Sequence, residues 1–420
     1  SLIMGKKPNE MFMSSGGQLK KINVANNSVS PVPFEAPFTY RPKQERDYMF
    51  NHVWQQVEDK FYLEDDLHGA PWEMYREVYG SKLKDISNNA DFAELLSEML
   101  GELNASHTGA RHYSYSSAQP TATLGVFYDE SYKGDGLKIA EIVKGSPLNI
   151  IKSDVEAGCI IEKIDGVAIT EGMDYFPLLE GKVNKPVILT VKSGEKGKSF
   201  EQSVKPISSA ALSSLLYKRW VDSRAAEVEA LSGGRLAYIH IQGMDSKSFR
   251  EMYSKLLGKY RNCEAVVVDT RHNGGGWLHD DVVTLLDGER YQDFIAHGQY
   301  IGSDPYNKWT KPSCMLICED NYSNAHGTPW VYKTLGVGKL IGTPVPGTMT
   351  AVWWESLIDP TIVFGIPQVG CVDVNGNYAE NMELEPDILV YNRPEETLGG
   401  KDSQLERAVS YMLGELDSAK

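Results

Sequence analysis

The sequence has no long apolar run and no surplus of basic residues. No stretch of its 420 residues approaches the roughly 18 consecutive apolar residues of a membrane-spanning helix. Acidic residues outnumber basic ones by 57 to 42, so the net charge is −15. Nucleic acids and anionic membranes are bound by basic surfaces, and we expect neither as a main partner. The first residues also lack the apolar core of a signal peptide, which leaves the cytoplasm and the periplasm open for a soluble chain.

Cysteine is scarce, and its spacing is unlike that of a zinc site. The five cysteines stand at positions 159, 263, 314, 318 and 371, without a CxxC pair. We therefore expect no metal and no cofactor. Cys314 and Cys318 fall on one expected strand, where their separation of roughly 13 Å is too long for a disulfide. The sequence predicts buried free thiols.

Two common catalytic motifs are also missing. No GxxxxGK[ST] loop occurs, which argues against a P-loop nucleotide site. No GxSxG elbow occurs either, which disfavours an α/β-hydrolase. Any catalytic residues must therefore belong to other clusters.

The hydrophobic pattern changes along the chain, whose length suits two or three domains. Residues 1–42 show little pattern and are expected to form an irregular arm or linker, with at most a short strand. Residues 43–113 carry three amphipathic helical patterns, and residues 114–208 consist of short Val/Ile/Leu runs between glycines. In residues 209–420 strands alternate with helices, which is typical of βαβ crossovers. We predict an α+β multidomain protein with a small helical bundle, a small β-barrel and an α/β domain.

One part of the β-rich segment resembles a known module. The stretch AGCIIEKIDG closely resembles the core of a PDZ domain, although Cys159 stands where that pattern commonly has Asp. Residues 124–127 (LGVF) resemble the PDZ loop that receives a peptide carboxylate. Such modules capture a chain end with a sheet edge and bare backbone N–H groups. The resemblance implies a PDZ-like barrel over residues 114–208, and another small β-barrel is the alternative.

A glycine-rich turn is the first cluster with catalytic potential. In VVVDTRHNGGGWL an apolar strand ends in Asp269, and Arg271, Asn273 and the glycines 274–276 lead into a helix. Backbone N–H groups at such a junction can stabilise an anion or an oxyanion. Gly-rich turns are common, however, so this turn alone leaves the function open.

Two further clusters contain a serine and a histidine. In CEDNYSNAHGTPW, Ser323 follows an apolar strand and precedes a helix. It is either an ordinary turn serine or a nucleophile whose helix start stabilises a negative intermediate. In GELNASHTGARH, His107 lies in a Ser/Thr/Gly turn after a helix, where a lone histidine is more often a plain surface residue. Neither cluster decides the function by itself.

The order of these motifs resembles that of the tricorn-type serine peptidases. LNASHTGAR, a PDZ-like module, VVVDTRHNGGG, NYSNAHGTPW and GNYAENMELEPDILV follow one another as they do in that family. The family belongs to the same broad group as the C-terminal processing peptidases, and the resemblance covers about residues 44–420. It implies a crotonase-like α/β catalytic domain over residues 209–420, substrates that are peptides or unfolded polypeptides, and a homo-oligomer.

The resemblance also implies a catalytic tetrad. The Ser-His pair of the family falls on Ser106 and His107, and its nucleophile falls on Ser323. Its carboxylate falls on Glu380, with Glu383 as a competing choice. In this scheme His107 takes the Ser323 proton, and Glu380 orients His107 through Ser106. The serine then attacks a peptide carbonyl and forms an acyl-enzyme.

The surroundings of the implied nucleophile depart from the family pattern. Asn324 replaces a common Asp, and His326 replaces an acidic residue, for which the sequence offers no explanation. The oxyanion donors would be the backbone N–H groups of Asn324 and of a glycine in the turn. Gly276 is favoured for this role, with Gly275 as its rival.

Two alternatives remain open. C-terminal processing peptidases use a Ser/Lys pair, but the loop GTPVPGTMTAVWW, where they carry the lysine, has none here. A Ser/Lys peptidase would need another lysine, such as Lys339. The second alternative is a non-catalytic PDZ scaffold on a peptidase fold, and the presence of the serine, the histidine and the carboxylate disfavours it.

Overall fold

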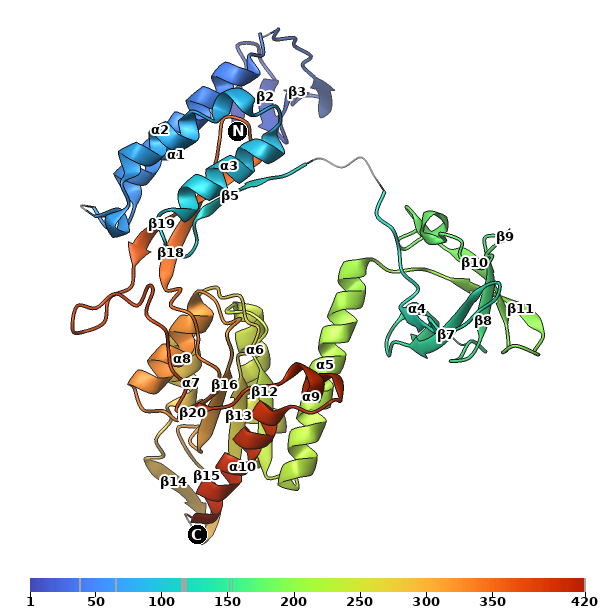
Figure 1. Cartoon of the computed structure of the whole chain (residues 1–420), viewed down its shortest axis with the longest axis vertical. Helices are drawn as coiled ribbons and strands as arrows, with labels where there is room; N and C mark the ends of the chain where they lie inside the picture. The colour runs from blue at the N-terminus through green and yellow to red at the C-terminus, as the bar shows by residue number, and fades with distance from the viewer. Residues whose placement is uncertain (38, 65, 115–118, 151, 153, 419–420) are drawn as a thin grey trace.

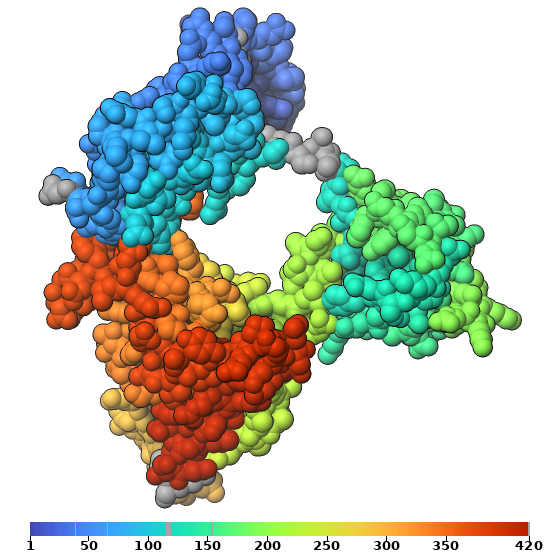
Figure 2. All heavy atoms as spheres, viewed as in Figure 1, coloured from blue at the N-terminus to red at the C-terminus, as the bar shows by residue number. Residues whose placement is uncertain are grey.

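The computed structural model describes residues 1–37, 39–64, 66–114, 119–150, 152 and 154–418. The domain ranges expected from the sequence also include residues 38, 65, 115–118, 151, 153 and 419–420, which lie outside the described residues. Figure 1 shows a helical part at one end, an α/β part at the other, and a β-rich part set to one side. In the space-filling view the three parts surround an open gap (Figure 2). No helix in the described ranges combines the length and the apolar character needed to cross a membrane.

The chain begins with a small sheet of four antiparallel strands in sequential order. The strands are β1 (Leu2–Met4), β2 (Glu10–Ser15), β3 (Gln18–Asn23) and β4 (Ser28–Pro31). Gly16 and Gly17 both have positive φ, which suits the two-residue turn between β2 and β3. The prediction of an irregular arm over residues 1–42 is therefore wrong for this stretch. Its strands are short, and their apolar residues fall in runs such as Leu2–Met4 and Met11–Met13 instead of alternating with polar ones.

The helical part contains the three amphipathic helices that the sequence predicts. They are α1 (Pro42–Lys60), α2 (Trp72–Gly80) and α3 (Asn89–Gly101), with one-turn 3₁₀ segments at Leu67–Gly69 and Leu83–Asp85. The side chain of Asn88 accepts a hydrogen bond from the Asp91 N–H and caps α3. The apolar faces of the helices meet in one core, which includes Phe50, Leu96 and Met99.

A hairpin from the C-terminal half of the chain completes this helical part. The sheet order is β18-β19-β5, formed by β18 (Thr350–Ser356), β19 (Ile362–Gly370) and β5 (Gly109–His112). Phe364 and Ile366 of β19 are buried in the same core as Leu96. A contiguous helical range of 43–113 therefore misses this hairpin, because strand pairing between β19 and β5 joins segments far apart in the sequence.

The β-rich part is a six-stranded antiparallel sheet in the order β11-β10-β8-β7-β6, with β9 paired to β8. Its strands are β6 (Val126–Tyr128), β7 (Leu137–Ile142), β8 (Ile160–Ile164), β9 (Val167–Ala168), β10 (Val187–Lys192) and β11 (Ser199–Val204). A short helix, α4 (Pro147–Ile150), and a 3₁₀ segment, Phe176–Leu179, complete it. Val187, Leu189 and Val191 alternate with more exposed neighbours, as in a sheet with one buried face.

The α/β part is built on five parallel strands in the order β12-β13-β16-β17-β20. The strands are β12 (Leu236–His240), β13 (Ala265–Asp269), β16 (Ser313–Ile317), β17 (Lys339–Gly342) and β20 (Ile388–Leu389). Every residue of β13 is buried, as its continuous apolar run leads one to expect for a strand covered on both faces. An antiparallel hairpin, β14 (Gln292–Ala296) and β15 (Gln299–Asp304), lies outside this sheet.

Helices cover both faces of the parallel sheet. One face packs against α6, α7 and α8, and the other packs against α5 and α10. Their bounds are α5 (Ser209–Ser232), α6 (Ser246–Ser254, continued by a π turn over Lys255–Lys259), α7 (His279–Leu286), α8 (Asn324–Thr334) and α10 (Ser403–Ser418), and α9 (Pro394–Leu398) precedes the last. Figure 1 shows that α5 also links this part to the β-rich part.

A buried ion cluster fixes the carboxyl end of β13. The guanidinium of Arg271 lies 2.7 Å from an oxygen of Asp269 and 2.9 Å from an oxygen of Asp402, just before α10. Tyr238 donates a further hydrogen bond to Asp269 at 2.8 Å. All three charged side chains are almost completely buried. The cluster therefore anchors the start of the glycine-rich turn that follows β13.

Candidate active site

Ser323 and His107 line the same pocket, although more than two hundred residues separate them in the sequence. His107 comes from the turn between α3 and β5, and Ser323 comes from the turn between β16 and α8. Gly276, Asn324 and Thr350 also line this pocket. The structure thus brings together residues from the helical part, the glycine-rich turn and the β18–β19 hairpin.

A chain of hydrogen bonds connects His107 to a buried carboxylate. The Nδ1 atom of His107 lies 2.7 Å from the Oγ of Ser106. The Ser106 hydroxyl donates to one oxygen of Glu380 at 2.9 Å, and the Ser106 backbone N–H donates to the other at 2.5 Å. Glu380 is only 5% exposed. The three side chains are therefore arranged in series, with the Nε2 side of the imidazole left for other contacts.

Two further groups hold the His107 ring. The Thr350 hydroxyl lies 3.0 Å from His107 Nδ1, and the Tyr322 hydroxyl accepts a hydrogen bond from the His107 backbone N–H at 2.7 Å. The rings of His107 and Tyr322 are in contact, with centroids 4.8 Å apart. His107 has a φ of 63°, which is uncommon for a residue other than glycine.

Burial shifts the titration of both ends of this chain. Desolvation lowers the pKa of His107 to about 4, so the imidazole is neutral at neutral pH and can accept a proton. Burial raises the pKa of Glu380, while the two hydrogen bonds from Ser106 act in the opposite direction. An ionised Glu380 would favour a positive charge on His107.

Ser323 sits at the start of α8 in a strained conformation. Its φ of 57° and ψ of −125° are rare for a residue with a side chain, and its N–H donates to Thr348 Oγ1 at 3.0 Å. Strain of this kind is concentrated at functional sites. Within the described ranges no hydrogen bond joins the Ser323 hydroxyl to the His107 ring, and such contacts often tighten only when substrate binds.

Two backbone N–H groups beside Ser323 are available to a ligand. Among the described residues, the N–H groups of Gly276 and Asn324 have no acceptor, whereas that of Gly275 donates to the Asn273 side chain at 2.8 Å. The hydrogen bonds thus favour Gly276 over its rival Gly275 as an oxyanion donor. Gly275 has a different task, because a Cβ there would lie 2.6 Å from the Cβ of Ser323.

The side chain of Asn324 connects the loop of Ser323 to the start of the helix after the glycine-rich turn. Its Oδ1 accepts hydrogen bonds from the N–H groups of Leu278 and His279 at 2.7 and 3.0 Å. These N–H groups are at the start of α7, so Asn324 caps that helix from outside. The carbonyl of an amide performs this task without the charge of the more common Asp.

His326 lies beneath the site and has no direct path to the pocket. It is 1% exposed, and desolvation lowers its pKa to about 4, so the ring is neutral. Its Nδ1 accepts a hydrogen bond from the Thr348 N–H at 3.3 Å, and the Thr348 hydroxyl accepts one from Ser323. His326 therefore supports the backbone of Ser323 through Thr348, a contact that the sequence pattern could not show.

Two candidates from the sequence lie outside this arrangement. Glu383 is exposed and makes no hydrogen bond or ion pair with the described residues, unlike Glu380. Lys339 begins β17 and pairs with Asp387 at 3.3 Å. β16 and β17 are parallel, so their carboxyl ends lie at the same end of the sheet. Ser323 follows the carboxyl end of β16, whereas Lys339 lies at the amino end of β17. The two residues are therefore at opposite ends of the strands.

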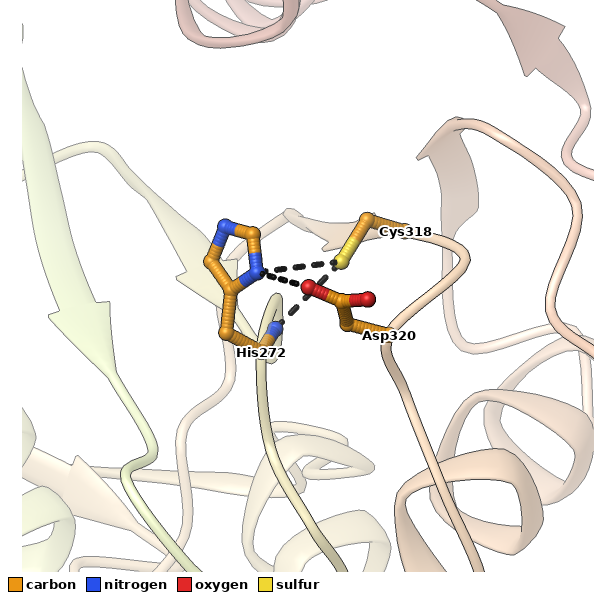
Figure 3. A group of neighbouring side chains, drawn as sticks. All are labelled: His272, Cys318 and Asp320. Carbon is orange, nitrogen blue, oxygen red and sulfur yellow. Dashed lines mark hydrogen bonds and ion pairs between the residues drawn. The ribbon is translucent and has the colours of Figure 1, made fainter.

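A cluster of three side chains close to this site was not predicted from the sequence. His272, Cys318 and Asp320 face one another at the carboxyl ends of β13 and β16 (Figure 3). The side chains of Cys318 and Asp320 raise the pKa of His272 to about 9. Sequence reasoning looked for closely spaced cysteines, whereas these residues come from two separate loops. The cysteines themselves are free thiols, as predicted, although Cys263 and Cys371 are only partly buried.

Comparisons with known proteins show which family the chain is related to. Residues 235–390 match the model of peptidase family S41, and residues 42–101 match the model of the tricorn protease C1 domain. The chain is thus related to the tricorn-type serine peptidases. This relationship confirms the family resemblance seen in the order of the sequence motifs.

Individual relatives support the same relationship. The chain is 26% identical to a putative tricorn-like protease C-terminal subunit of Sulfurisphaera tokodaii, over 90% of this chain and 44% of that protein. It is 28% identical to tricorn protease homolog 1 of Streptomyces coelicolor, over 90% of this chain and 36% of that protein. The chain therefore spans less than half the length of these curated relatives. A crystal structure of the tricorn protease matches 99% of this chain and 41% of its own, with a TM-score of 0.84 and 21% identity, which shows a shared fold.

Proposed function

We propose that this chain is a serine peptidase in which Ser323 is the nucleophile and His107 the general base. The observation that carries the proposal is the series of contacts from Glu380 through Ser106 to His107, which ends in the pocket that Ser323 lines. A neutral imidazole, a buried carboxylate and a strained serine at a helix start are the parts that acyl transfer requires. The relationship to the tricorn-type peptidases supports the same chemistry.

The proposed reaction begins with attack of the Ser323 Oγ on a peptide carbonyl. His107 Nε2 takes the serine proton, and the imidazolium keeps its Nδ1–H directed at Ser106 Oγ. The Ser106 hydroxyl donates in turn to Glu380, which stabilises the positive charge. His107 then gives its proton to the leaving amine, and water releases the acyl group by the same steps in reverse.

The tetrahedral intermediate needs donors for its negative oxygen. The free N–H groups of Gly276 and Asn324 can supply them beside Ser323. Removing one such donor costs roughly 100- to 1,000-fold in kcat in comparable sites. The pocket also presents Met349, Ala351 and Val352, so we infer that an uncharged side chain is accepted next to the cleaved bond.

We further propose that the β-rich part is a PDZ-like module that binds free peptide ends. β6 is an edge strand of the sheet, and Phe127, Tyr128 and Tyr175 line a pocket beside it. An edge strand can accept an extended peptide as an additional strand. One expected donor is occupied, because the Gly125 N–H donates to the Thr123 hydroxyl at 3.1 Å. Binding of a peptide with a free carboxylate, but not of its amidated form, to the Ser323→Ala chain tests this proposal.

A serine-reactive fluorophosphonate probe tests the peptidase proposal. We expect the wild type to be labelled, Ser323→Ala to lose labelling completely, and Ser254→Ala, at an exposed serine of α6, to keep it. His107→Ala should slow labelling by orders of magnitude, whereas His297→Ala in the β14–β15 turn should not. Equal labelling of Ser323→Ala would overturn the assignment, and an unlabelled wild type would favour the non-catalytic scaffold.

A further inference from the structure

Three potential metal ligands meet at the edge of the parallel sheet. His272 lies in the turn that follows β13, and Cys318 and Asp320 directly follow β16. The two strands are parallel neighbours, with Asp269 paired to Leu316, so their carboxyl ends lie side by side. Figure 3 shows the imidazole, the thiol and the carboxylate directed at one another. None of these three side chains has a part in the proposed peptidase reaction.

The distances are close to those of a metal shell. His272 Nδ1 lies 3.8 Å from Cys318 Sγ and 2.8 Å from Asp320 Oδ2. All three ligand atoms lie within 4.8 Å of one another. Around a tetrahedral zinc ion with bonds of about 2.0–2.3 Å, ligand atoms are roughly 3.3–3.6 Å apart. Side-chain adjustments of less than about 1 Å would therefore bring the three atoms into the first coordination shell.

The thiol of the cluster is held in place by its surroundings. Cys318 Sγ accepts a hydrogen bond from the His272 backbone N–H at 3.3 Å, and the Cys318 N–H donates to the Asn321 side chain at 3.2 Å. Asn321 is itself buried and donates to Thr270 at 2.9 Å. Cys318 is 4% exposed, whereas the side chains of His272 and Asp320 are 61% and 66% exposed. The thiol is thus buried and held by hydrogen bonds, whereas the imidazole and the carboxylate are open to solvent.

The ligand types select the class of metal. Thiolate, imidazole and carboxylate together suit zinc and similar soft or borderline cations, whereas Mg²⁺ and Ca²⁺ prefer oxygen ligands. Three protein ligands leave a fourth position for water or another ligand. A simple ion pair would require only His272 and Asp320, and the thiol at 3.8 Å from the same ring nitrogen is the additional feature.

We propose that His272, Cys318 and Asp320 form a binding site for a zinc-like divalent cation. In the metal-free cluster the Nδ1–H of His272 donates to Asp320, and the cation takes the place of this proton and of the thiol proton. The bound cation joins the turn after β13 to the loop after β16.

The position of the site gives the cation a structural consequence. The turn after β13 continues from His272 to Gly276, and the loop after β16 continues from Cys318 to Ser323. These two segments already share hydrogen bonds, among them those from the His272 N–H to Cys318 Sγ at 3.3 Å and from the Tyr322 N–H to the Asn273 carbonyl at 3.0 Å. A cation would add a stronger connection. If the proposed function holds, this connection would fix the position of the oxyanion donors relative to the nucleophile.

Cobalt(II) is a suitable probe, because a thiolate ligand gives it a charge-transfer band in the near ultraviolet. We expect the whole chain, freshly reduced, to bind one equivalent of cobalt with this band, and zinc to displace it. Cys318→Ser should abolish the band. His272→Ala and Asp320→Asn change exposed side chains and should fold normally, but should weaken binding by at least about 10- to 100-fold. Cys263→Ser and His297→Ala are the matched controls and should bind as the wild type does.

The outcomes separate this site from the peptidase proposal. A wild type without the band, or a Cys318→Ser variant that retains it, would overturn the metal site whatever the enzyme activity. Labelling of Ser323 by the fluorophosphonate probe reports on the peptidase proposal, whether or not cobalt binds. If cobalt and zinc bind as expected but leave the labelling rate of the wild type unchanged, the connection between the two loops does not affect the nucleophile.

Discussion

The replacement of Glu380 by glutamine is the sharpest test of the proposed relay. Glutamine has nearly the same shape, but one of its two terminal groups is a donor. Glu380 accepts two hydrogen bonds, one from the N–H and one from the hydroxyl of Ser106. The amide can accept only one of them, so the variant must lose the other. The Ser106 backbone N–H can only donate, so the amide oxygen must face it. The amide NH₂ is therefore directed at the Ser106 hydroxyl.

The loss of that contact changes the proton on His107. With Glu380, the Ser106 hydroxyl donates to the carboxylate, and its oxygen accepts the Nδ1–H of His107. With glutamine, the Ser106 oxygen accepts from the amide, and its proton is free to bond to Nδ1. His107 then carries its proton on Nε2, where it cannot take the proton of Ser323. This is the wrong tautomer for a general base.

The size of the effect follows from these contacts. A hydrogen bond to a charged group contributes about 1.5–3 kcal/mol, and each 1.36 kcal/mol changes a rate about tenfold. The loss of one such bond gives a decrease of roughly 10- to 150-fold in kcat/KM. Trapping the wrong tautomer adds to this, and a comparable change in a serine peptidase lowers kcat by about 10⁴-fold.

The assay is the hydrolysis of a fluorogenic peptide, together with the rate of fluorophosphonate labelling. Glu383→Gln is the matched control, since Glu383 is exposed and lies three residues further along the chain. We expect the control to stay within about twofold of the wild type. The reasoning is refuted if Glu380→Gln keeps its activity within about threefold, or if both variants lose activity equally while melting at the wild-type temperature.

Three further outcomes test other parts of the structure. Burial lowers the pKa of His107 to about 4, and the neutral ring is the proposed active form. In a pH profile, kcat/KM should therefore stay constant from pH 8 to below pH 6 and fall only towards pH 4. A midpoint near 6.5 would contradict this. Gly275→Ala places a Cβ 2.6 Å from the Cβ of Ser323, at a φ of 95°. It should lower the labelling rate on the order of 100-fold and also lower the melting temperature. Gly274→Ala, which has open space around its Cβ, should melt as the wild type does. Arg271→Leu removes the cation paired with buried Asp269 and leaves Asp402 with Arg224 alone, at 3.6 Å. It should lower the free energy of unfolding by about 3–5 kcal/mol in urea titrations, against about 0–1 kcal/mol for the exposed Arg290→Leu.

The sequence was most informative where local pattern decides the structure. The continuous apolar run of β13 and the alternation of strands and helices predicted the parallel sheet, because burial on both faces leaves a clear signal. The three amphipathic helices were visible because each buries one face, which leaves a helical spacing of apolar residues. The residues of the candidate site, in contrast, became recognisable through the order of motifs in a known family.

The sequence was least informative where distant segments meet. The pairing of β19 with β5 joins residues 362–365 to residues 109–112, and no local signal records it. The same holds for His326, whose contact with Thr348 depends on how two loops pack. The sheet of residues 2–31 was missed because its short strands show no alternation of apolar and polar residues. A cluster such as that of His272 and Cys318 cannot be found by looking for closely spaced ligands.

The β18–β19 hairpin also sets the order in which activity can arise during synthesis. Residues 42–112, which contain the proposed base, leave the ribosome long before residues 350–370, whose strands complete the sheet and core around them. Glu380 follows later still, shortly after that hairpin. A nascent or truncated chain therefore has an unsupported His107 even after Ser323 has been made. Under the proposed mechanism, the site is therefore assembled only after residues 42–380 have been made.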